Sequence, residues 1–239
     1  MLDIINGLFS LIFVSISILV GILIAFKYFK KRSRTFLLVG ITWILMTAPW
    51  YPSTVTFLVS LFTPLEIEMY VIMVIGNLIL PFVLITWIAA FTDLIARYKK
   101  NQKLIVGFTS LLVAVYLILF VIFLIAIPDL IGKPAGKADV QNGIYVTSFQ
   151  LLSLIVVIIT GTIFSRESLR KDNREVRIKG KFLLIAFYSL AIGSILDVFS
   201  SFNFILLIVA RIILITSAVE FYFGFILPPG VKKLLEIEA

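Results

Sequence analysis

The sequence of 239 residues contains no cysteine and no histidine, and each absence excludes a group of functions. Without cysteine there is no disulfide, no thiolate nucleophile and no thiolate ligand for an iron–sulfur cluster. Without histidine the chain lacks the usual axial ligand of haem, the imidazole ligands of membrane zinc hydrolases and the base of intramembrane serine proteases. We therefore expect no haem, no bound metal and no enzymatic activity, since no nucleophile–base pair or metal-ligand set is visible.

Charged residues are scarce as well, at 14% of the chain, whereas hydrophobic residues make up 61%. Soluble domains average about 25% and about 45–50%, respectively. About 20 apolar residues span a bilayer, and the chain contains seven such stretches. The predicted fold class is an all-α integral membrane protein, a single seven-transmembrane helix bundle over residues 1–239, with helices at about 5–26, 36–60, 66–96, 104–127, 143–165, 182–202 and 204–227.

Lysine and arginine gather in alternate loops. The loops 27–35, 97–103 and 166–181 and the tail after residue 227 hold 18 of the 21 basic residues, and the opposite loops hold two. Cytoplasmic loops carry such an excess. The sequence therefore predicts an outside N-terminus and a cytoplasmic C-terminus in the cell (plasma) membrane. The net charge of +8 then points to membrane lipid rather than nucleic acid as a partner.

Local signals predict where the spans begin, bend and end. Thr63-Pro64-Leu65-Glu66 reads as a capping box that starts the third helix. Pro49 and Pro52 are expected to kink the second helix. Further signals predict a flexible outer loop at 132–137, a tight turn at 200–203 that makes the last two helices antiparallel neighbours, and a short amphipathic helix at 231–239.

Ionisable residues inside the membrane are candidate functional residues because burying charge in lipid is costly. Asp197 and Arg211 lie at similar depth on two helices joined by a short turn, so we expect an ion pair. Either this pair locks the two helices together, or Arg211 holds an anionic ligand. Glu220 lies half a helical turn out of phase with Arg211. It is a candidate proton or ion site, with a structural hydrogen bond as the alternative.

Aromatic and amide side chains of the second and third spans complete a candidate ligand site in the outer half. Trp50 and Tyr51 lie at the predicted kink, and Tyr70 and Asn77 share one face of the third helix. Kinks in membrane helices often border cavities, but an aromatic belt and interhelical hydrogen bonds are the alternatives. The predicted ligand-binding residues are Trp50, Tyr51, Tyr70, Asn77, Asp197 and Arg211.

The cytoplasmic loop 166–181 holds seven basic and three acidic residues, including a favourable i,i+4 pair, Glu175–Lys179. A similar pair is expected between Asp93 and Arg97. The loop either sets the topology by contact with anionic lipid or docks a cytoplasmic protein partner. In the second case the partner-binding residues are Arg170, Lys171, Arg174 and Arg177.

Two resemblances bear on function. Seven helices with short loops resemble the architecture of microbial rhodopsins, but the last span, Arg211 to Glu220, has no lysine for a retinal Schiff base, so no retinal cofactor is implied. The third span resembles the seven-helix sensor regions that precede prokaryotic histidine kinases, and stand-alone archaeal seven-helix proteins, through Tyr70, Gly76, Pro81, Trp87 and Phe91-Thr92-Asp93. This resemblance implies a sensor whose output passes through a separate protein.

Three functions remain open. The first is a receptor or sensor that binds a small or lipidic ligand in its outer half and signals through a separate cytoplasmic partner. The second is a transporter or channel for a small solute or proton, and the third is a structural membrane protein. The absence of an internal repeat counts against transporters built from duplicated units.

Overall fold

The computed structural model describes residues 2–64, 67–134, 140–199 and 203–236. Seven helical spans in these ranges are long and apolar enough to cross a membrane, which supports a multi-pass membrane protein with an all-α fold. The elements are α1 (Leu2–Lys31), α2 (Arg34–Met46), η1 (Ala48–Trp50), α3 (Tyr51–Phe62), α4 (Met69–Asn77), α5 (Phe82–Leu94), α6 (Ala96–Lys99), α7 (Gln102–Ala126), η2 (Pro128–Leu130), β1 (Gly132–Pro134), β2 (Val140–Asn142), α8 (Ile144–Leu169), α9 (Arg174–Val198), α10 (Phe204–Phe225) and α11 (Pro229–Leu234).

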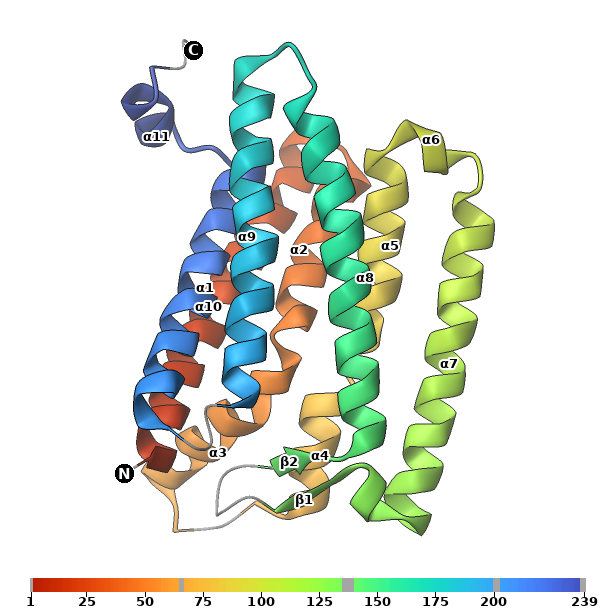
Figure 1. Ribbon diagram of the computed structural model, residues 1–239, viewed down its shortest axis with the longest axis vertical. Helices are drawn as coiled ribbons and strands as arrows, with labels where there is room; N and C mark the ends of the chain where they lie inside the picture. Colours follow the sequence, from red (N-terminus) through yellow and green to blue (C-terminus); the bar gives the residue numbers. More distant parts are fainter. Residues whose placement is uncertain (1, 65–66, 135–139, 200–202, 237–239) are drawn as a thin grey trace.

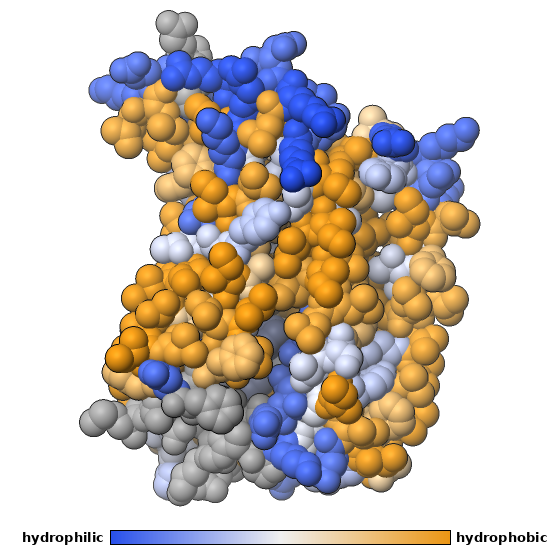
Figure 2. All heavy atoms as spheres, in the orientation of Figure 1, coloured by the Kyte–Doolittle hydropathy of each residue, from blue (hydrophilic) through white to orange (hydrophobic). Residues whose placement is uncertain are grey.

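The long helices run side by side, so the molecule has two distinct ends (Figure 1). We call one the basic end; it carries the connections 32–33, 95–101 and 170–173 together with α11. We call the other the hairpin end, because the β1–β2 hairpin lies there. Hydrophilic residues cover the basic end, and a hydrophobic surface follows below it, with polar groups again near the hairpin end (Figure 2).

The second and third spans are both broken; the break in the second was predicted from Pro49 and Pro52, and the break in the third was not. The second consists of α2, η1 and α3, with Pro49 in η1 and Pro52 in the first turn of α3. The third divides into α4 and α5 just before Pro81, which has no amide hydrogen and cannot continue the ladder. Asn77 ends α4, and its side-chain amide donates to the Met73 carbonyl of the same helix at 3.1 Å.

Several predicted boundaries are wrong. The helix predicted to start at 66 begins at Met69, and Thr63 instead caps the end of α3, donating its hydroxyl to the Val59 carbonyl at 3.2 Å. Glu66 of the predicted capping box lies outside the described residues. Part of the predicted flexible loop at 132–137 pairs as β1 with β2; residues 135–137 are not described.

The predicted basic loop 166–181 is mostly helix. α8 continues to Leu169 and α9 begins at Arg174, so only 170–173 connect them. Two local interactions extend α9: Asn173 caps it by accepting from the Val176 amide at 3.2 Å, and Glu175 pairs with Lys179 at 2.5 Å, as predicted. The tail forms α11, which docks on α9 through Lys232 and Glu175 at 2.6 Å.

The predicted antiparallel contact between the last two long helices is confirmed, although residues 200–202 of the turn are not described. α9 and α10 approach closely at two glycines, where Gly193 faces Leu214 and Gly224 faces Leu183. Small residues permit this approach, which dispersion forces then stabilise within lipid.

A layer of fully buried aromatic rings crosses the middle of the bundle. Trp43 stacks on Phe221 with ring centroids 3.9 Å apart, and Phe221 meets Phe187 edge-on at 5.8 Å. Phe187 in turn contacts Trp87 at 5.3 Å, whose indole donates to the Thr160 hydroxyl at 2.7 Å. We call Trp43, Trp87, Phe187 and Phe221 the aromatic layer; each is at most 1% exposed.

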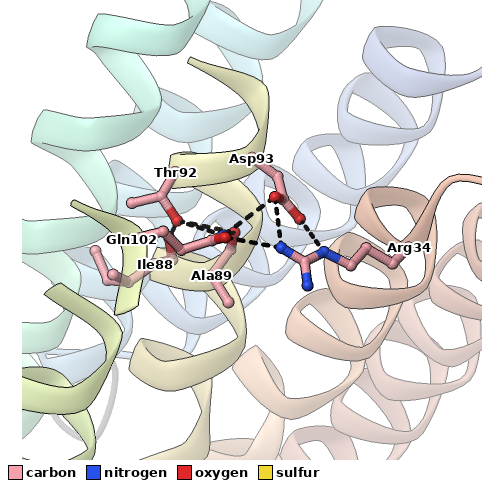
Figure 3. A network of polar contacts seen from close by, with 6 residues as sticks. All are labelled: Arg34, Ile88, Ala89, Thr92, Asp93 and Gln102. Atoms are coloured by element: carbon pink, nitrogen blue, oxygen red, sulfur yellow. Dashed lines mark hydrogen bonds and ion pairs between the residues drawn. The ribbon is translucent and has the colours of Figure 1, made fainter. Parts of the chain in front are cut away.

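The predicted pair of Asp93 with Arg97 is wrong. α5 ends at Leu94 and the chain turns at Ile95, so residues 93 and 97 do not share a helix. Asp93 instead accepts two hydrogen bonds from Arg34 of α2, at 2.7 and 2.8 Å, and one from Gln102 of α7 at 3.1 Å (Figure 3). This network joins three spans at the basic end.

The close contact between α1 and α2 leads to a stability prediction. In Gly40→Ala the added methyl group would lie against the Gly21 carbonyl oxygen and 2.8 Å from the Ala25 amide nitrogen. We expect thermal unfolding in detergent to show a loss of ~1–3 kcal/mol, because backbone must move. The control Gly107→Ala meets nothing within 4 Å and should raise stability by ~0.5–1 kcal/mol; equal effects of the two changes would contradict the packing.

Candidate functional site

A cavity of about 330 Å³ lies between α2, η1, α5, α8 and α9 in the half of the bundle nearer the hairpin end. α8 and α9 form its two sides, and η1 with the start of α5 forms its floor. Its volume is at the lower end of the range of small-molecule sites. It is lined by Met46, Pro49, Trp50, Leu80, Val83, Thr147, Gln150, Leu151, Ser153, Leu154, Val157, Leu190, Ser194, Ile195, Val198 and Phe199.

The distribution of glycine along α8 and α9 accounts for the cavity. Gly180 of α9 packs against Ser168 near the basic end, and Gly161 of α8 packs against the Phe187 ring at mid-bundle. From Ile144 to Thr160, α8 has no further glycine, and Gly193 of α9 faces α10. The two helices therefore pack closely in one half and leave space between them in the other.

The cavity opens sideways, towards the region that lipid would occupy. Residues at its rim are strongly exposed: Leu151 and Ile195 at 48% each and Val198 at 63%. The space-filling view shows a hollow between α9 and α8 in the lower half of the molecule (Figure 2). A molecule dissolved in a bilayer could enter here without crossing water.

Among the described residues the lining carries no charged side chain, and only four of those residues have polar side chains besides Trp50. Thr147 and Gln150 lie nearest the hairpin end, and Gln150 donates to Asn77 at 3.3 Å. Ser153 and Ser194 lie deeper, on opposite sides. The remaining lining residues are apolar, so the cavity suits an uncharged, mostly apolar molecule.

Behind the cavity lies a charged cluster that Trp50 joins to it. The Trp50 ring lines the cavity while its indole nitrogen donates to Asp197 at 2.8 Å. Asp197 pairs with Arg211 at 3.3 Å, and Arg211 donates to Asn6 of α1 at 2.6 Å. The guanidinium also lies 5.8 Å from the Trp50 ring, a cation–π arrangement. We call Asn6, Trp50, Asp197 and Arg211 the polar cluster.

The structure thus brings together three of the six predicted ligand-binding residues. Asp197 and Arg211 form the expected pair, with side chains 17% and 4% exposed, and do not line the cavity. Tyr51 turns back to its own span and donates to the Ile44 carbonyl at 2.6 Å. Tyr70 is 54% exposed, and Asn77 is bound to Gln150.

Sequence reasoning missed Asn6, Gln150, Ser153 and Ser194. Asn6 and Gln150 are isolated amides within apolar spans, and that rarity was a usable signal. Serine is common in membrane helices, where it often bonds its own backbone. Nothing in the sequence therefore distinguished Ser153 and Ser194 from the others.

Glu220 lies apart from the polar cluster, as its phase predicts. It is half-buried on α10, beside Phe221 of the aromatic layer. One of its carboxyl oxygens is buried without a hydrogen-bond partner among the described residues. Within the described ranges no three carboxylates come together as a metal site.

The four predicted partner-binding residues lie around the 170–173 connection at the basic end. Arg170, Lys171 and Arg177 are exposed. Arg174 is engaged with the tail, donating to the carbonyl oxygens of Leu235 and Glu236 at 3.1 and 3.0 Å. Beside them a second hollow, of about 530 Å³, is lined by residues of α5, α6, α8 and α9, among them Arg97 and Lys171.

Comparison of the chain with protein-family models, with curated proteins and with solved structures gives no match.

The polar cluster leads to a prediction about the free energy of unfolding: substituting Asp197 alone should cost more than substituting Asp197 and Arg211 together. Asp197→Ala leaves the buried Arg211 without its carboxylate, and we expect the free energy of unfolding to fall by ~3–5 kcal/mol. Adding Arg211→Met should recover most of that loss, because the uncompensated charge is then gone. The comparison is a double-mutant cycle in detergent, measured by thermal unfolding.

The matched control is Asp129→Ala, which removes a surface pair with Lys133 whose side chains are 71% and 62% exposed. Its effect should stay below ~1 kcal/mol. A double variant of Asp197 and Arg211 as unstable as Asp197→Ala alone would show that the pair is not the source of the loss.

Proposed function

We propose that this protein is a receptor-like or sensor-like protein of the plasma membrane that binds a small or lipidic ligand in the cavity between α8 and α9. The hairpin end would face outside and the basic end the cytoplasm, because cytoplasmic loops carry the excess of lysine and arginine. Output would pass through the basic end to a separate cytoplasmic partner.

One observation carries this proposal: Trp50 belongs both to the cavity wall and to the polar cluster. A ligand packed on the Trp50 ring would change the position of its indole nitrogen, which holds Asp197. A hydrogen bond from an indole N–H to a carboxylate loses strength steeply when its geometry departs from linearity. Occupancy of an uncharged cavity would thereby alter a charged contact outside it.

The polar cluster offers a route from the cavity to the basic end. Asp197 and Arg211 lie on α9 and α10, which pack tightly along their length. α9 continues as one helix to Arg174, beside the exposed Arg170, Lys171 and Arg177. A small shift or rotation of α9 would move these cations and α11 together, since α11 is bound to Glu175 and Arg174 of the same helix.

The separation of the two hollows favours a receptor over a channel. Along the third span the cavity is lined by Leu80 and Val83 and the second hollow by Leu94, with Trp87 between them. Along α9, Phe187 likewise lies between the two. The aromatic layer, which is fully buried, thus stands between the cavity and the basic end in this conformation.

A proton-coupled transporter or channel is the second candidate. One carboxyl oxygen of Glu220 is buried without a hydrogen-bond partner among the described residues, and this observation favours it. Such a carboxyl group can exchange a proton. In proteoliposomes with a pH-sensitive dye inside, a transporter would give proton flux that Glu220→Gln reduces at least about tenfold, the loss expected of a positioned proton carrier. Flux equal to that of empty liposomes would remove this candidate.

The receptor proposal predicts a ligand-dependent change at the basic end, and the cysteine-free chain allows specific labelling there. Lys100→Cys and Asp172→Cys, both at exposed positions, would carry spin labels in phosphatidylcholine nanodiscs. We expect an extract of native membrane lipids to shift the distance between the labels by about 1–2 Å or more, the scale of helix shifts in switching proteins.

Two additional substitutions test whether the shift starts in the cavity. Ser194→Phe fills the cavity and should abolish the shift, whereas Ser15→Phe, on an exposed face of α1, should preserve it. A distance that stays constant in all three proteins would favour the structural role instead.

A further inference from the structure

The lining of the cavity restricts the chemical class of its ligand. Asp197 and Arg211 do not line it. In the part of the chain that the structure describes, its walls are hydrocarbon apart from Trp50 and four polar side chains, none of which is ionisable. A charged headgroup placed there would lose its hydration without gaining a counter-charge, which is costly in an apolar site. The ligand therefore has to be uncharged in the part that enters.

Two serine hydroxyls in the deeper part of the cavity have no hydrogen-bond partner among the residues that the structure describes. Ser153 is 5% exposed, and its hydroxyl oxygen is buried without a hydrogen bond to any described residue. Ser194 lines the opposite wall, and its hydroxyl likewise makes no hydrogen bond within the described ranges. In membrane helices serine usually bonds a carbonyl of the preceding turn, as Ser168 does with Phe164 at 3.1 Å.

The packing of α8 against α9 places these two serines at one level. Gly161 lies opposite Phe187 and Ser168 opposite Gly180, which defines an antiparallel register. Followed from Gly161 towards the hairpin end, this register brings Ser153 level with Ser194 and Ile195. The hydroxyls of Ser153 and Ser194 thus belong to the same layer of the cavity, one on each side.

We propose that the cavity binds an uncharged amphiphile, a hydrocarbon chain bearing a hydroxyl or carbonyl group, whose oxygen hydrogen-bonds to Ser153 and Ser194. This inference rests on the cavity being the ligand site, as proposed above. The chain lies along the apolar walls and leaves through the lipid-facing opening at Leu151 and Ile195. A hydroxyl or carbonyl oxygen satisfies the two serines, whose hydroxyls find no partner in the described part of this apolar site.

The test compares three photoactivatable probes that share one alkyl diazirine chain and end in a hydroxyl, a carboxylate or a methyl group. The full chain is reconstituted in phosphatidylcholine nanodiscs with equal amounts of each probe, irradiated and analysed by peptide mass spectrometry. We expect the hydroxyl probe to label 147–157 and 190–199 at least about tenfold more than the carboxylate probe, and several times more than the methyl probe.

The variant Ser153→Ala/Ser194→Ala should lower labelling by the hydroxyl probe about tenfold and leave labelling by the methyl probe unchanged, since two hydrogen bonds are lost but the apolar walls remain. The matched control is Ser15→Ala, outside the cavity, which should leave labelling by both probes unchanged. The comparison of probes on the wild-type chain requires no variant, so it holds whether or not the double variant folds.

Each other result overturns a defined part of the inference. Equal or stronger labelling of the cavity by the carboxylate probe would show that the ligand is not restricted to uncharged molecules, while leaving the cavity as a binding site. Equal labelling by the methyl and hydroxyl probes would remove the role of the serines. If none of the three probes labels 147–157 or 190–199 above the rest of the lipid-facing surface, both this inference and the cavity as ligand site are wrong.

Discussion

The buried guanidinium of Arg211 requires a fixed set of partners around it. A charge inside an apolar bundle is tolerated only when a counter-charge and hydrogen bonds replace its hydration. Asp197 supplies the charge, Asn6 a carbonyl oxygen and Trp50 a ring face. These groups come from α10, α9, α1 and η1, so one electrostatic requirement holds the first, second, sixth and seventh spans in register at the hairpin end.

The cavity arises beside this cluster because the remaining spans are held by a different kind of contact. Where glycine faces a neighbouring helix, as at Gly161 and Gly180, backbones approach closely and no space is left. Where α8 presents Gln150, Ser153 and Leu154 instead, the helices stand apart and the space between them is not filled by side chains. Trp50 closes that space on one side and holds Asp197 on the other.

At the basic end a buried charge is also paired with a counter-charge, but here the partner is exposed. Asp93 is 7% exposed in its side chain, and its partner Arg34 is 63% exposed. Arg34 and Asp93, together with Gln102, join α2, α5 and α7 on one side of the aromatic layer. The polar cluster joins α1, η1, α9 and α10 on the other side. A signal between the two ends would have to pass along helices that cross that layer.

Composition and the spacing of apolar residues were sufficient to predict seven helices long enough to cross a membrane, because lipid requires each span to be continuous and apolar. The positions of Pro49 and Pro52 predicted the break in the second span, since a missing amide hydrogen acts locally. The Asp197–Arg211 pair followed from depth and a short connection alone.

Sequence could not predict that Asp93 would bind Arg34 rather than Arg97, because the end of α5 at Leu94 removes the helical spacing on which that expectation relied. Nor could it show that Tyr70 faces outward, that Asn6 completes the cluster, or that Ser153 and Ser194 lie opposite each other. Those facts depend on the distance between packed helices and on the rotation of each helix about its axis. Both quantities are set only by the sum of contacts between spans that are distant in sequence.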